Sequence, residues 1–99
     1  MDVRHSYQGI IFEWDSRKEE SNFRKHGISF EIACEAFLDP LVISLEDNVA
    51  NDELREKIIG MTTDWRFLYV VYLWKVDDIL RIISARHATK KERIFYENQ

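Results

Sequence analysis

The segment Trp65–Trp74 constrains the fold of this chain more than any other feature of its sequence. It is rich in aromatic and β-branched residues, and it is apolar on both of its alternating faces. This pattern is typical of a central strand that is covered on each side. Two flanking segments, Leu54–Met61 and Ile79–His87, also have the composition of strands. Because the connections between the three segments are short, we expect an antiparallel meander.

A first helix is expected over Arg17–His26, because both of its ends carry helix signals. Ser16 with Glu19 three residues later matches a capping box, and Gly27 is a typical C-terminal glycine. Phe23 is the only large apolar residue of this segment. The helix should therefore be polar on almost every face.

Two more helices are expected further along the chain. Ser29 can cap a helix whose apolar residues recur at helical spacing and which Asp39-Pro40 forces to stop. Thr89 and Glu92 form a second capping box, which opens a helix at the C-terminal end of the sequence.

Shorter strands are predicted at Ile10–Trp14 and Leu41–Leu45, and the acidic segment Glu46–Glu53 is predicted to be a loop. The order of strand, helix, helix, strands and helix is typical of the α+β class. We expect an antiparallel sheet of about four to five strands, packed with two N-terminal helices and a C-terminal helix. A chain of 99 residues folds around one core, so residues 1–99 should form a single domain.

The sequence predicts a soluble, cytoplasmic protein without a membrane partner. Its longest apolar stretch, Phe67–Trp74, is far shorter than the ~18 residues that span a bilayer. No apolar run of signal-peptide length follows the charged N-terminus. The single cysteine, Cys34, cannot form an internal disulfide, which favours a reducing compartment.

Charge is segregated along the chain, although the net charge is only −4. Acids dominate between residues 31 and 56, and bases dominate between residues 79 and 93. The bases of the second segment are Arg81, Arg86, Lys90, Lys91 and Arg93. This segregation is compatible either with ordinary solvated surfaces or with a local nucleic-acid site.

No motif predicts a metal or a cofactor. The three histidines are far apart in the sequence, and no HExxH or CxxC spacing occurs. The three glycines are isolated, so no phosphate-binding glycine loop is expected. Cys34 lies among apolar residues and is expected to pack in the core.

Cations at two places suggest a phosphate-binding surface. Lys18, Asn22, Lys25 and His26 fall on one stripe of the first helix. Arg81, Arg86, Lys90 and Arg93 belong to the last strand and the last helix, and they would join this stripe if the first and last helices lay on the same side of the sheet. Aromatic side chains such as Trp65 and Tyr96 can stack on bases. Alternatively, Arg81 forms an ion pair with a carboxylate such as that of Glu56, and the other cations are solvated.

Two long motifs resemble the BrnT toxins of bacterial type II toxin-antitoxin systems. The first consists of Phe12-Glu13-Trp14-Asp15, Lys18, Asn22, Lys25-His26-Gly27-Ile28-Ser29-Phe30-Glu31, Ala33, Phe37 and Asp39-Pro40. The second consists of Arg55, Ile59-Gly60, Arg81-Ile82-Ile83-Ser84-Ala85-Arg86, Ala88-Thr89-Lys90-Lys91-Glu92-Arg93 and Tyr96. The resemblance covers nearly the whole chain.

This resemblance implies a RelE-like fold, metal-independent endoribonuclease activity that arrests growth, and neutralisation by a BrnA-type antitoxin. It also implies that operator DNA is bound only through the antitoxin. Two positions depart from the family pattern. Leu54 stands where an acid often precedes the arginine, and His87 stands where a lysine is common. If that acid acts in catalysis, the departure predicts a weakened toxin.

Cleavage of RNA without a metal needs a base, an acid and cations that stabilise the charge of the phosphorane. We expect Arg81 and Arg86 to stabilise the phosphate, with help from Lys18 or Lys25. His26 is the predicted proton carrier, because imidazole titrates near neutral pH. The residues predicted to bind RNA are Lys25, Asn22, Lys90, Arg93 and Tyr96, and weaker catalytic candidates are Glu56, Lys57 and Tyr96.

Two other functions fit the same sequence. One is a catalytically inactive corepressor that keeps the toxin fold and binds the antitoxin, and the other is a plain structural partner without affinity for RNA. Growth arrest on expression of the chain alone separates the toxin from both alternatives.

Overall fold

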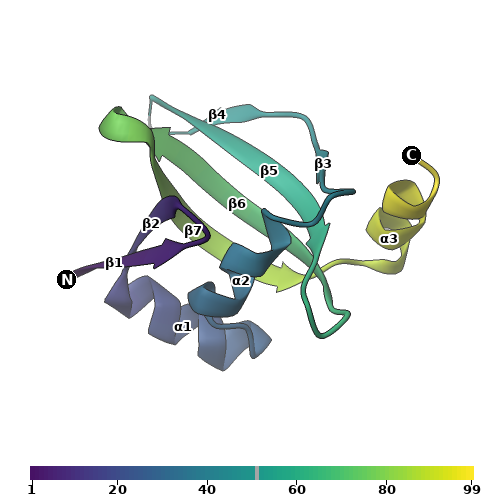
Figure 1. Cartoon of the computed structure of the whole chain (residues 1–99), viewed down its shortest axis with the longest axis horizontal. Helices are drawn as coiled ribbons and strands as arrows, with labels where there is room; N and C mark the ends of the chain where they lie inside the picture. The colour runs from purple at the N-terminus through teal and green to yellow at the C-terminus, as the bar shows by residue number, and fades with distance from the viewer. Residues whose placement is uncertain (51) are drawn as a thin grey trace.

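The computed structural model describes residues 1–50 and 52–99, which form an α+β fold as predicted (Figure 1). The described residues contain seven strands and three α-helices. The strands are β1 (Asp2–Tyr7), β2 (Ile10–Asp15), β3 (Ile43–Ser44), β4 (Asn48–Ala50), β5 (Glu53–Met61), β6 (Phe67–Lys75) and β7 (Ile79–His87). The helices are α1 (Ser16–His26), α2 (Phe30–Ala36) and α3 (Lys90–Glu97), and a short 3-10 turn, η1 (Val76–Asp78), joins β6 to β7.

The sheet is larger than predicted, and it is mixed. Its strand order is β1-β2-β7-β6-β5-β3, and β4 also pairs with β5. The predicted meander of β5, β6 and β7 is confirmed. However, β2 runs parallel to β7, so the expectation of a purely antiparallel sheet of four to five strands is wrong.

The additional strands occur where the sequence is polar. Strand β1 forms a hairpin with β2 through Gln8 and Gly9, which both have positive φ angles. Its side chains alternate between exposed and half-buried positions, and this alternation with period two is the signal of a strand. Strand β4 lies within the predicted acidic loop. Both are short or polar edge elements, for which hydrophobic patterning gives a weak signal.

Helix α2 covers one face of the sheet and forms the core with it, and α1 lies against β7 through the buried Asn22. The core includes Phe12 and Trp14 of β2, Phe30 and Cys34 of α2, and apolar residues of β5, β6 and β7. Cys34 is fully buried, as predicted. Helix α2 lies directly on β5: a Cβ atom added at Gly60 would come within 2.2 Å of the Ala36 carbonyl oxygen.

A bulge in β7 changes which side chains face the core. Val71 pairs with Ser84 and Tyr72 pairs with Ile82, so Ile83 is the extra residue. Strict alternation predicts Ala85 on the face opposite Ile82, yet Ala85 is fully buried in the same core. The bulge thereby places Arg81 and Arg86 on the same face of the sheet, opposite the core and α2.

The ends of the helices agree with the sequence except at the start of α1. Asp15, not Ser16, caps α1 by accepting a hydrogen bond from the Arg17 amide. Glu19 does not close a capping box. It accepts hydrogen bonds from the Trp14 indole and the Phe30 amide instead, which ties β2 and α2 to α1. The predicted caps Ser29 and Thr89 are confirmed.

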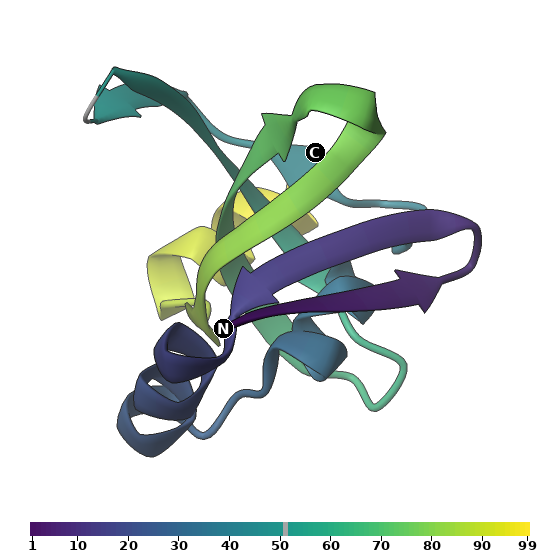
Figure 2. The same cartoon turned by 90° about the vertical axis from the view of Figure 1, so that its left-hand side faces the viewer.

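Helix α3 packs against the other face of the sheet. A hollow between α3 and the sheet is lined by Leu45, by Ile59 of β5 and by the helix residues Ile94 and Phe95. Ile59 alternates with Ile58 and Gly60, which face α2. Figure 1 shows α3 at the opposite end of the molecule from α1 and α2, and in Figure 2 α3 and α1 lie on one side of the view. The joining of the α1 stripe with the cations of β7 and α3 therefore stays a prediction. None of the helices described is long and apolar enough to cross a membrane.

Candidate functional site

Arg86 lies at the end of β7 and is held in one orientation by three groups. Its Nη1 and Nη2 atoms donate to both carboxylate oxygens of Glu92, at 2.8 and 3.0 Å. Nη1 also donates to the His87 carbonyl oxygen at 3.1 Å. The guanidinium stacks on the Tyr69 ring, 3.9 Å from its centroid. The hydrogen bond to Glu92 raises the pKa of Arg86 and lowers the pKa of Glu92, so both groups stay charged.

Glu92 connects this arginine to the start of α3. The Glu92 carboxylate accepts a hydrogen bond from the Thr89 amide at 2.8 Å, and the Thr89 hydroxyl accepts one from the Glu92 amide at 3.2 Å. The predicted capping box is therefore confirmed. The same carboxylate fixes both the helix terminus and the guanidinium, so Arg86 cannot reorient without disturbing α3.

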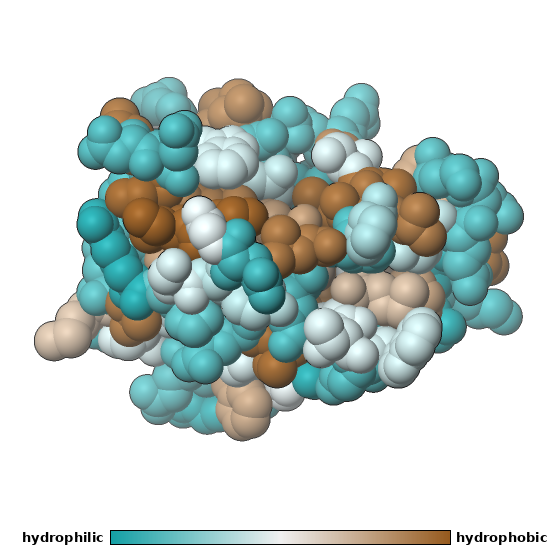
Figure 3. Space-filling model, in the orientation of Figure 1, coloured by the Kyte–Doolittle hydropathy of each residue, from teal (hydrophilic) through white to brown (hydrophobic). Residues whose placement is uncertain are grey.

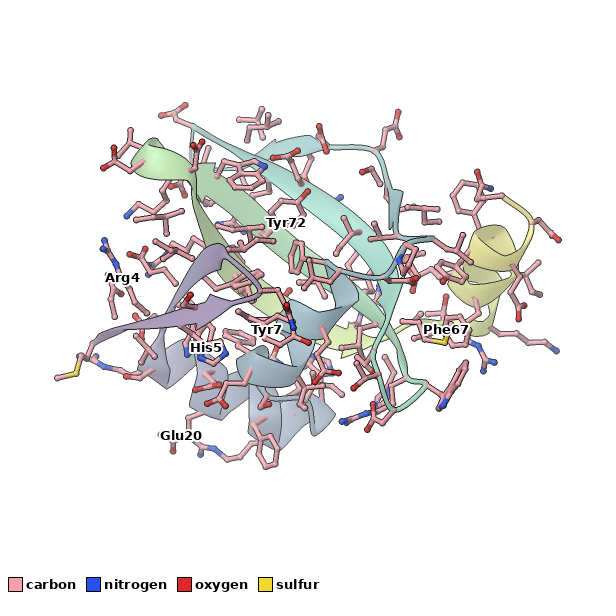
Figure 4. All side chains as sticks on the ribbon, viewed as in Figure 1. Arg4, His5, Tyr7, Glu20, Phe67 and Tyr72 are labelled. Atoms are coloured by element: carbon pink, nitrogen blue, oxygen red, sulfur yellow. The ribbon has the colours of Figure 1, made fainter. Side chains whose placement is uncertain are left out.

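A hollow of about 260 Å³ lies beside the end of β7. It is lined by Trp65, Arg66, Phe67, His87, Ala88 and Arg93. The Arg93 guanidinium lies over the Phe67 ring, 4.6 Å from its centroid. Figure 4 shows Phe67 next to α3, on the opposite side of the molecule from Arg4. We call this hollow together with Arg86 the strand-end site. It combines cations with aromatic faces, the combination that binds single-stranded nucleic acids.

Arg81 does not belong to the strand-end site. It is five residues from Arg86 along β7, roughly 16 Å at the rise of a strand. Its guanidinium pairs with the buried carboxylate of Glu13 and with Asp2, and Arg4 and Lys75 each lie 3.5 Å from the same Glu13 carboxylate. The ion-pair alternative from the sequence is therefore observed, but with Glu13 and Asp2 in place of Glu56.

Asn22 is a structural residue in this fold. Its side chain is 8% exposed, and its amide nitrogen donates to the carbonyl oxygens of Ile28 and Ala85. Its amide oxygen accepts from the Ala85 amide. Because β2 ends at Asp15, the Asn22 amide takes the place of a neighbouring strand beside Ala85. The predicted contact of Asn22 with RNA is replaced by these internal hydrogen bonds.

The other members of the predicted α1 stripe point away from the core. Lys18 and Lys25 are exposed and His26 is half-buried. None of them forms a hydrogen bond or an ion pair with β7 or α3 within residues 1–50 and 52–99. Their contribution to an RNA site therefore stays a prediction.

Tyr96 is also engaged within the protein. Its hydroxyl donates to Asp39 Oδ2 at 2.6 Å, and its ring packs edge-on against Phe67. Burial and the hydrogen bond to Asp39 raise the pKa of Tyr96 to about 12. The same carboxylate oxygen accepts from the Met61 amide at 2.8 Å. Tyr96 therefore anchors α3, and its predicted contact with RNA stays a prediction.

Part of the strand-end site was missing from the sequence prediction. Arg66, Phe67 and His87 were not proposed as site residues, because they come from a turn and a strand end that only the meander brings together. Lys90, by contrast, is exposed on the first turn of α3, as its predicted role requires. The capping box was the sequence signal that placed this helix start directly after the strand.

Residues 1–50 and 52–99 contain no cluster of metal ligands. Among these residues, no group of three or more His, Cys, Asp or Glu side chains is close enough to hold a metal ion. Burial raises the pKa of the Cys34 thiol to about 12, so this cysteine is a core residue and not a nucleophile.

Acidic side chains gather at the other end of the meander, around the start of β5. This acidic surface consists of Glu46, Asp47, Asp52, Glu53 and Glu56. Burial and the nearby charge of Asp47 raise the pKa of Glu56. Large apolar side chains, Val49 and Leu54, lie exposed beside it. Figure 3 shows the same mixture across one face of the molecule, with apolar patches between hydrophilic ones.

The sequence of this chain matches a family of ribonuclease toxins, and its fold is shared with one of them. A family model described as "Ribonuclease toxin, BrnT, of type II toxin-antitoxin system" matches residues 14–92. The chain belongs to this BrnT family, as the two sequence motifs predicted. Departures at Leu54 and His87 do not prevent the match.

A solved structure shares this fold. The 1.1 Å crystal structure of the Brucella abortus ribonuclease toxin, BrnT, superposes with a TM-score of 0.53 and 23% sequence identity. The match covers 78% of this chain and 94% of that one. Among curated proteins, none matches the chain.

Proposed function

We propose that residues 1–99 form a single endoribonuclease toxin domain that cleaves RNA without a metal ion. The observation that supports this proposal most directly is the fixed guanidinium of Arg86 beside the cationic and aromatic hollow. Membership of a ribonuclease toxin family supports the class of reaction. No cofactor is required in this proposal.

In the proposed reaction the 2′-hydroxyl of the RNA attacks the adjacent phosphorus. A base takes the proton of that hydroxyl, negative charge develops on the phosphorane oxygens, and the departing 5′-oxygen is protonated. The products are a 2′,3′-cyclic phosphate and a 5′-hydroxyl. Arg86 stabilises the phosphorane, because a guanidinium that is already oriented needs no reorganisation as the charge develops.

Arg86 can bind a phosphate while it remains paired with Glu92. A guanidinium has five N–H donors. Three of them are used toward the Glu92 carboxylate and the His87 carbonyl, which leaves two for an incoming oxygen. Glu92 in this proposal orients the arginine, and Lys90 and Arg93 attract the flanking phosphates of the RNA.

The proposed proton carrier is His87, with His26 as the earlier candidate from the sequence. His87 follows Arg86 directly and lines the hollow, whereas His26 lies on α1. Imidazole is suited to this role because it exchanges protons near neutral pH. Arg81, Lys18 and Lys25 stay predicted contributors, and the ion pairs of Arg81 favour a structural role for it.

The proposed partner in the cytoplasm is a BrnA-type antitoxin, and operator DNA is bound through that partner. The acidic surface can bind a basic segment of the antitoxin. In the strand-end site, carboxylates of the antitoxin can bind where the phosphates of RNA would bind. In the absence of antitoxin, cleavage of cellular RNA should arrest growth.

The test is expression of wild-type chain, Arg86→Lys and His87→Gln without antitoxin, combined with cleavage of RNA by the purified proteins in EDTA. Wild type should arrest growth and cleave RNA with chelator present. Loss of one oriented transition-state contact should slow Arg86→Lys by about 100-fold or more. Activity that disappears in EDTA and returns with magnesium would contradict the metal-free reaction.

One observation favours a second function, that of an inactive corepressor which binds the antitoxin. The Arg86 guanidinium is already paired with a carboxylate, and the exposed Leu54 stands at a position where the family often has an acid. A corepressor should form the antitoxin complex without arresting growth or cleaving RNA, and Arg86→Lys should then change neither result.

A further inference from the structure

We propose that the hollow beside the end of β7 is a subsite for one unpaired nucleotide of single-stranded RNA, with the base stacked on Trp65 and the adjoining phosphate held by Arg93. This inference rests on the proposed function, because it states that the RNA substrate is single-stranded and where one of its nucleotides binds. It makes Trp65 and Phe67, together with Arg93, the residues that select single-stranded RNA.

Trp65 is presented to solvent at a backbone position that most residues avoid. Its side chain is 78% exposed, and its φ angle is 68°. A bulky residue with positive φ is uncommon, and such a conformation persists only where the surroundings impose it. An exposed indole next to a hollow is a flat, apolar surface that has no partner within the described chain.

The turn that carries Trp65 is held rigidly from within. Thr62, which is 4% exposed, accepts hydrogen bonds from the Arg66 amide at its hydroxyl and from the Trp65 amide at its carbonyl. The carboxylate of Glu35 on α2 accepts from both the amide and the hydroxyl of Thr63, at 2.9 and 2.8 Å. The turn is thus fastened to a core helix. A base that stacks on Trp65 therefore meets a surface that needs little further ordering.

The charges around the hollow point to a phosphate beside the base. The Arg66 guanidinium is already paired with Asp64, 2.9 Å away. Arg93 lies over the Phe67 ring and, among the residues described, has no carboxylate within salt-bridge distance. Its charge is therefore available to an incoming anion, and the ring beneath it limits its movement.

The size of the hollow favours one nucleotide over a duplex. Its volume of about 260 Å³ is below the roughly 300–1,000 Å³ of pockets for drug-sized ligands. Bases are available for stacking on an aromatic side chain only when they are unpaired. The same features would accept an aromatic side chain of the antitoxin, and the experiment below includes that outcome.

The test measures binding of a short single-stranded RNA in which every 2′-hydroxyl is methylated, so that cleavage cannot interfere. Trp65→Ala should weaken binding by roughly 5- to 140-fold, the range for loss of one stacked base. Trp65→Phe should restore most of the affinity, because it keeps an aromatic face. Arg93→Gln should weaken binding and reduce its dependence on salt.

Trp74→Ala is the matched control. Trp74 is 51% exposed, and it lies near the opposite end of β6 from Trp65. Its loss should leave RNA affinity unchanged. A duplex that contains the same sequence should compete poorly with the single strand. Melting temperatures of all variants confirm that they are folded.

The outcomes separate the subsite from the proposed reaction. If Trp65→Ala binds and cleaves RNA like Trp74→Ala while the wild type is an active ribonuclease, the subsite is wrong and the reaction stands. If binding depends on Trp65 but the wild type cleaves no RNA, the subsite stands and the reaction is wrong. If Trp65→Ala weakens only the complex with the antitoxin, the hollow is a protein contact and the RNA subsite is overturned.

Discussion

Arg81→Gln should destabilise the fold without removing the catalytic chemistry. Glu13 is 3% exposed, and the Arg81 guanidinium is its closest cation. Removing one partner of a buried ion pair typically costs about 3–5 kcal/mol, because the other charge is left buried and uncompensated. Arg4 and Lys75 still lie 3.5 Å from Glu13, so we expect a loss near the lower end, about 3 kcal/mol.

The expected loss depends on pH in a direction that the structure determines. Burial by itself raises the pKa of Glu13, but the hydrogen bond and charge of Arg81 together with the charge of Lys75 lower it below its usual 4.5. The stabilisation is therefore present above pH 4.5 and is lost as the pH falls through the lowered folded-state value. In Arg81→Gln burial should dominate at Glu13. The difference in stability between the two proteins should be largest at neutral pH and should shrink in acid.

The assay is urea unfolding of wild type, Arg81→Gln and Lys91→Gln at neutral and acidic pH, with RNA cleavage measured well below each melting temperature. Lys91 is exposed on α3, so its variant should stay within about 0.5 kcal/mol of wild type. A loss of about 3 kcal/mol should lower the melting temperature of a domain of this size by roughly 12–24 °C. If Arg81→Gln is as stable as wild type but about 100-fold slower in cleavage, Arg81 is a catalytic residue and the structural assignment is refuted.

Three other predictions follow from single contacts. Asn22→Ala leaves the amide and carbonyl of Ala85 without their partner, and urea unfolding should show a loss of about 2–4 kcal/mol with no change in RNA affinity for each folded molecule. Gly60→Ala forces its Cβ against the Ala36 carbonyl oxygen, so the melting curve should report a loss of about 1–3 kcal/mol. The rate of association with the antitoxin should fall strongly with added salt for wild type and less for Glu53→Gln, because exposed charges steer the encounter. Equal salt dependence of the two rates in stopped-flow measurements would exclude the acidic surface as an antitoxin contact.

The central part of the fold was accessible from the sequence because local and tertiary preferences agree there. Strand β7 has the bounds predicted from its composition, and Thr89 and Glu92 form the predicted capping box. Each of these signals depends on residues that are close in sequence. The polar strand β1 and the short strand β4 escaped prediction because pairing with β2 and β5, not hydrophobic patterning, makes them strands.

The candidate site was predictable only in part, for a different physical reason. Residue type shows which side chains carry charge, but it does not show which charges are already neutralised. Arg81 and Arg86 look alike in the sequence, and both pair with a carboxylate, but Arg81 pairs with the buried Glu13 of β2 whereas Arg86 pairs with Glu92 beside an open hollow. Asn22 lies in a polar stripe of the sequence. Because β2 ends before it reaches Ala85, the Asn22 side chain forms the hydrogen bonds to the Ala85 backbone that a neighbouring strand would form. Both distinctions depend on contacts between residues more than 60 positions apart.

A net charge of −4 is compatible with RNA binding because the two charged regions are well separated. Trp65 precedes β6 and the acidic surface surrounds the start of β5, which pairs with the far part of β6. Nine strand residues span roughly 30 Å. The Debye length at physiological ionic strength is about 8 Å, so the acidic surface contributes little repulsion at the strand-end site. An RNA that approaches Arg86 and Arg93 therefore responds to the local cations. The acids at the other end stay available for a basic partner, which allows one small domain to bind an anion and a cationic protein at different surfaces.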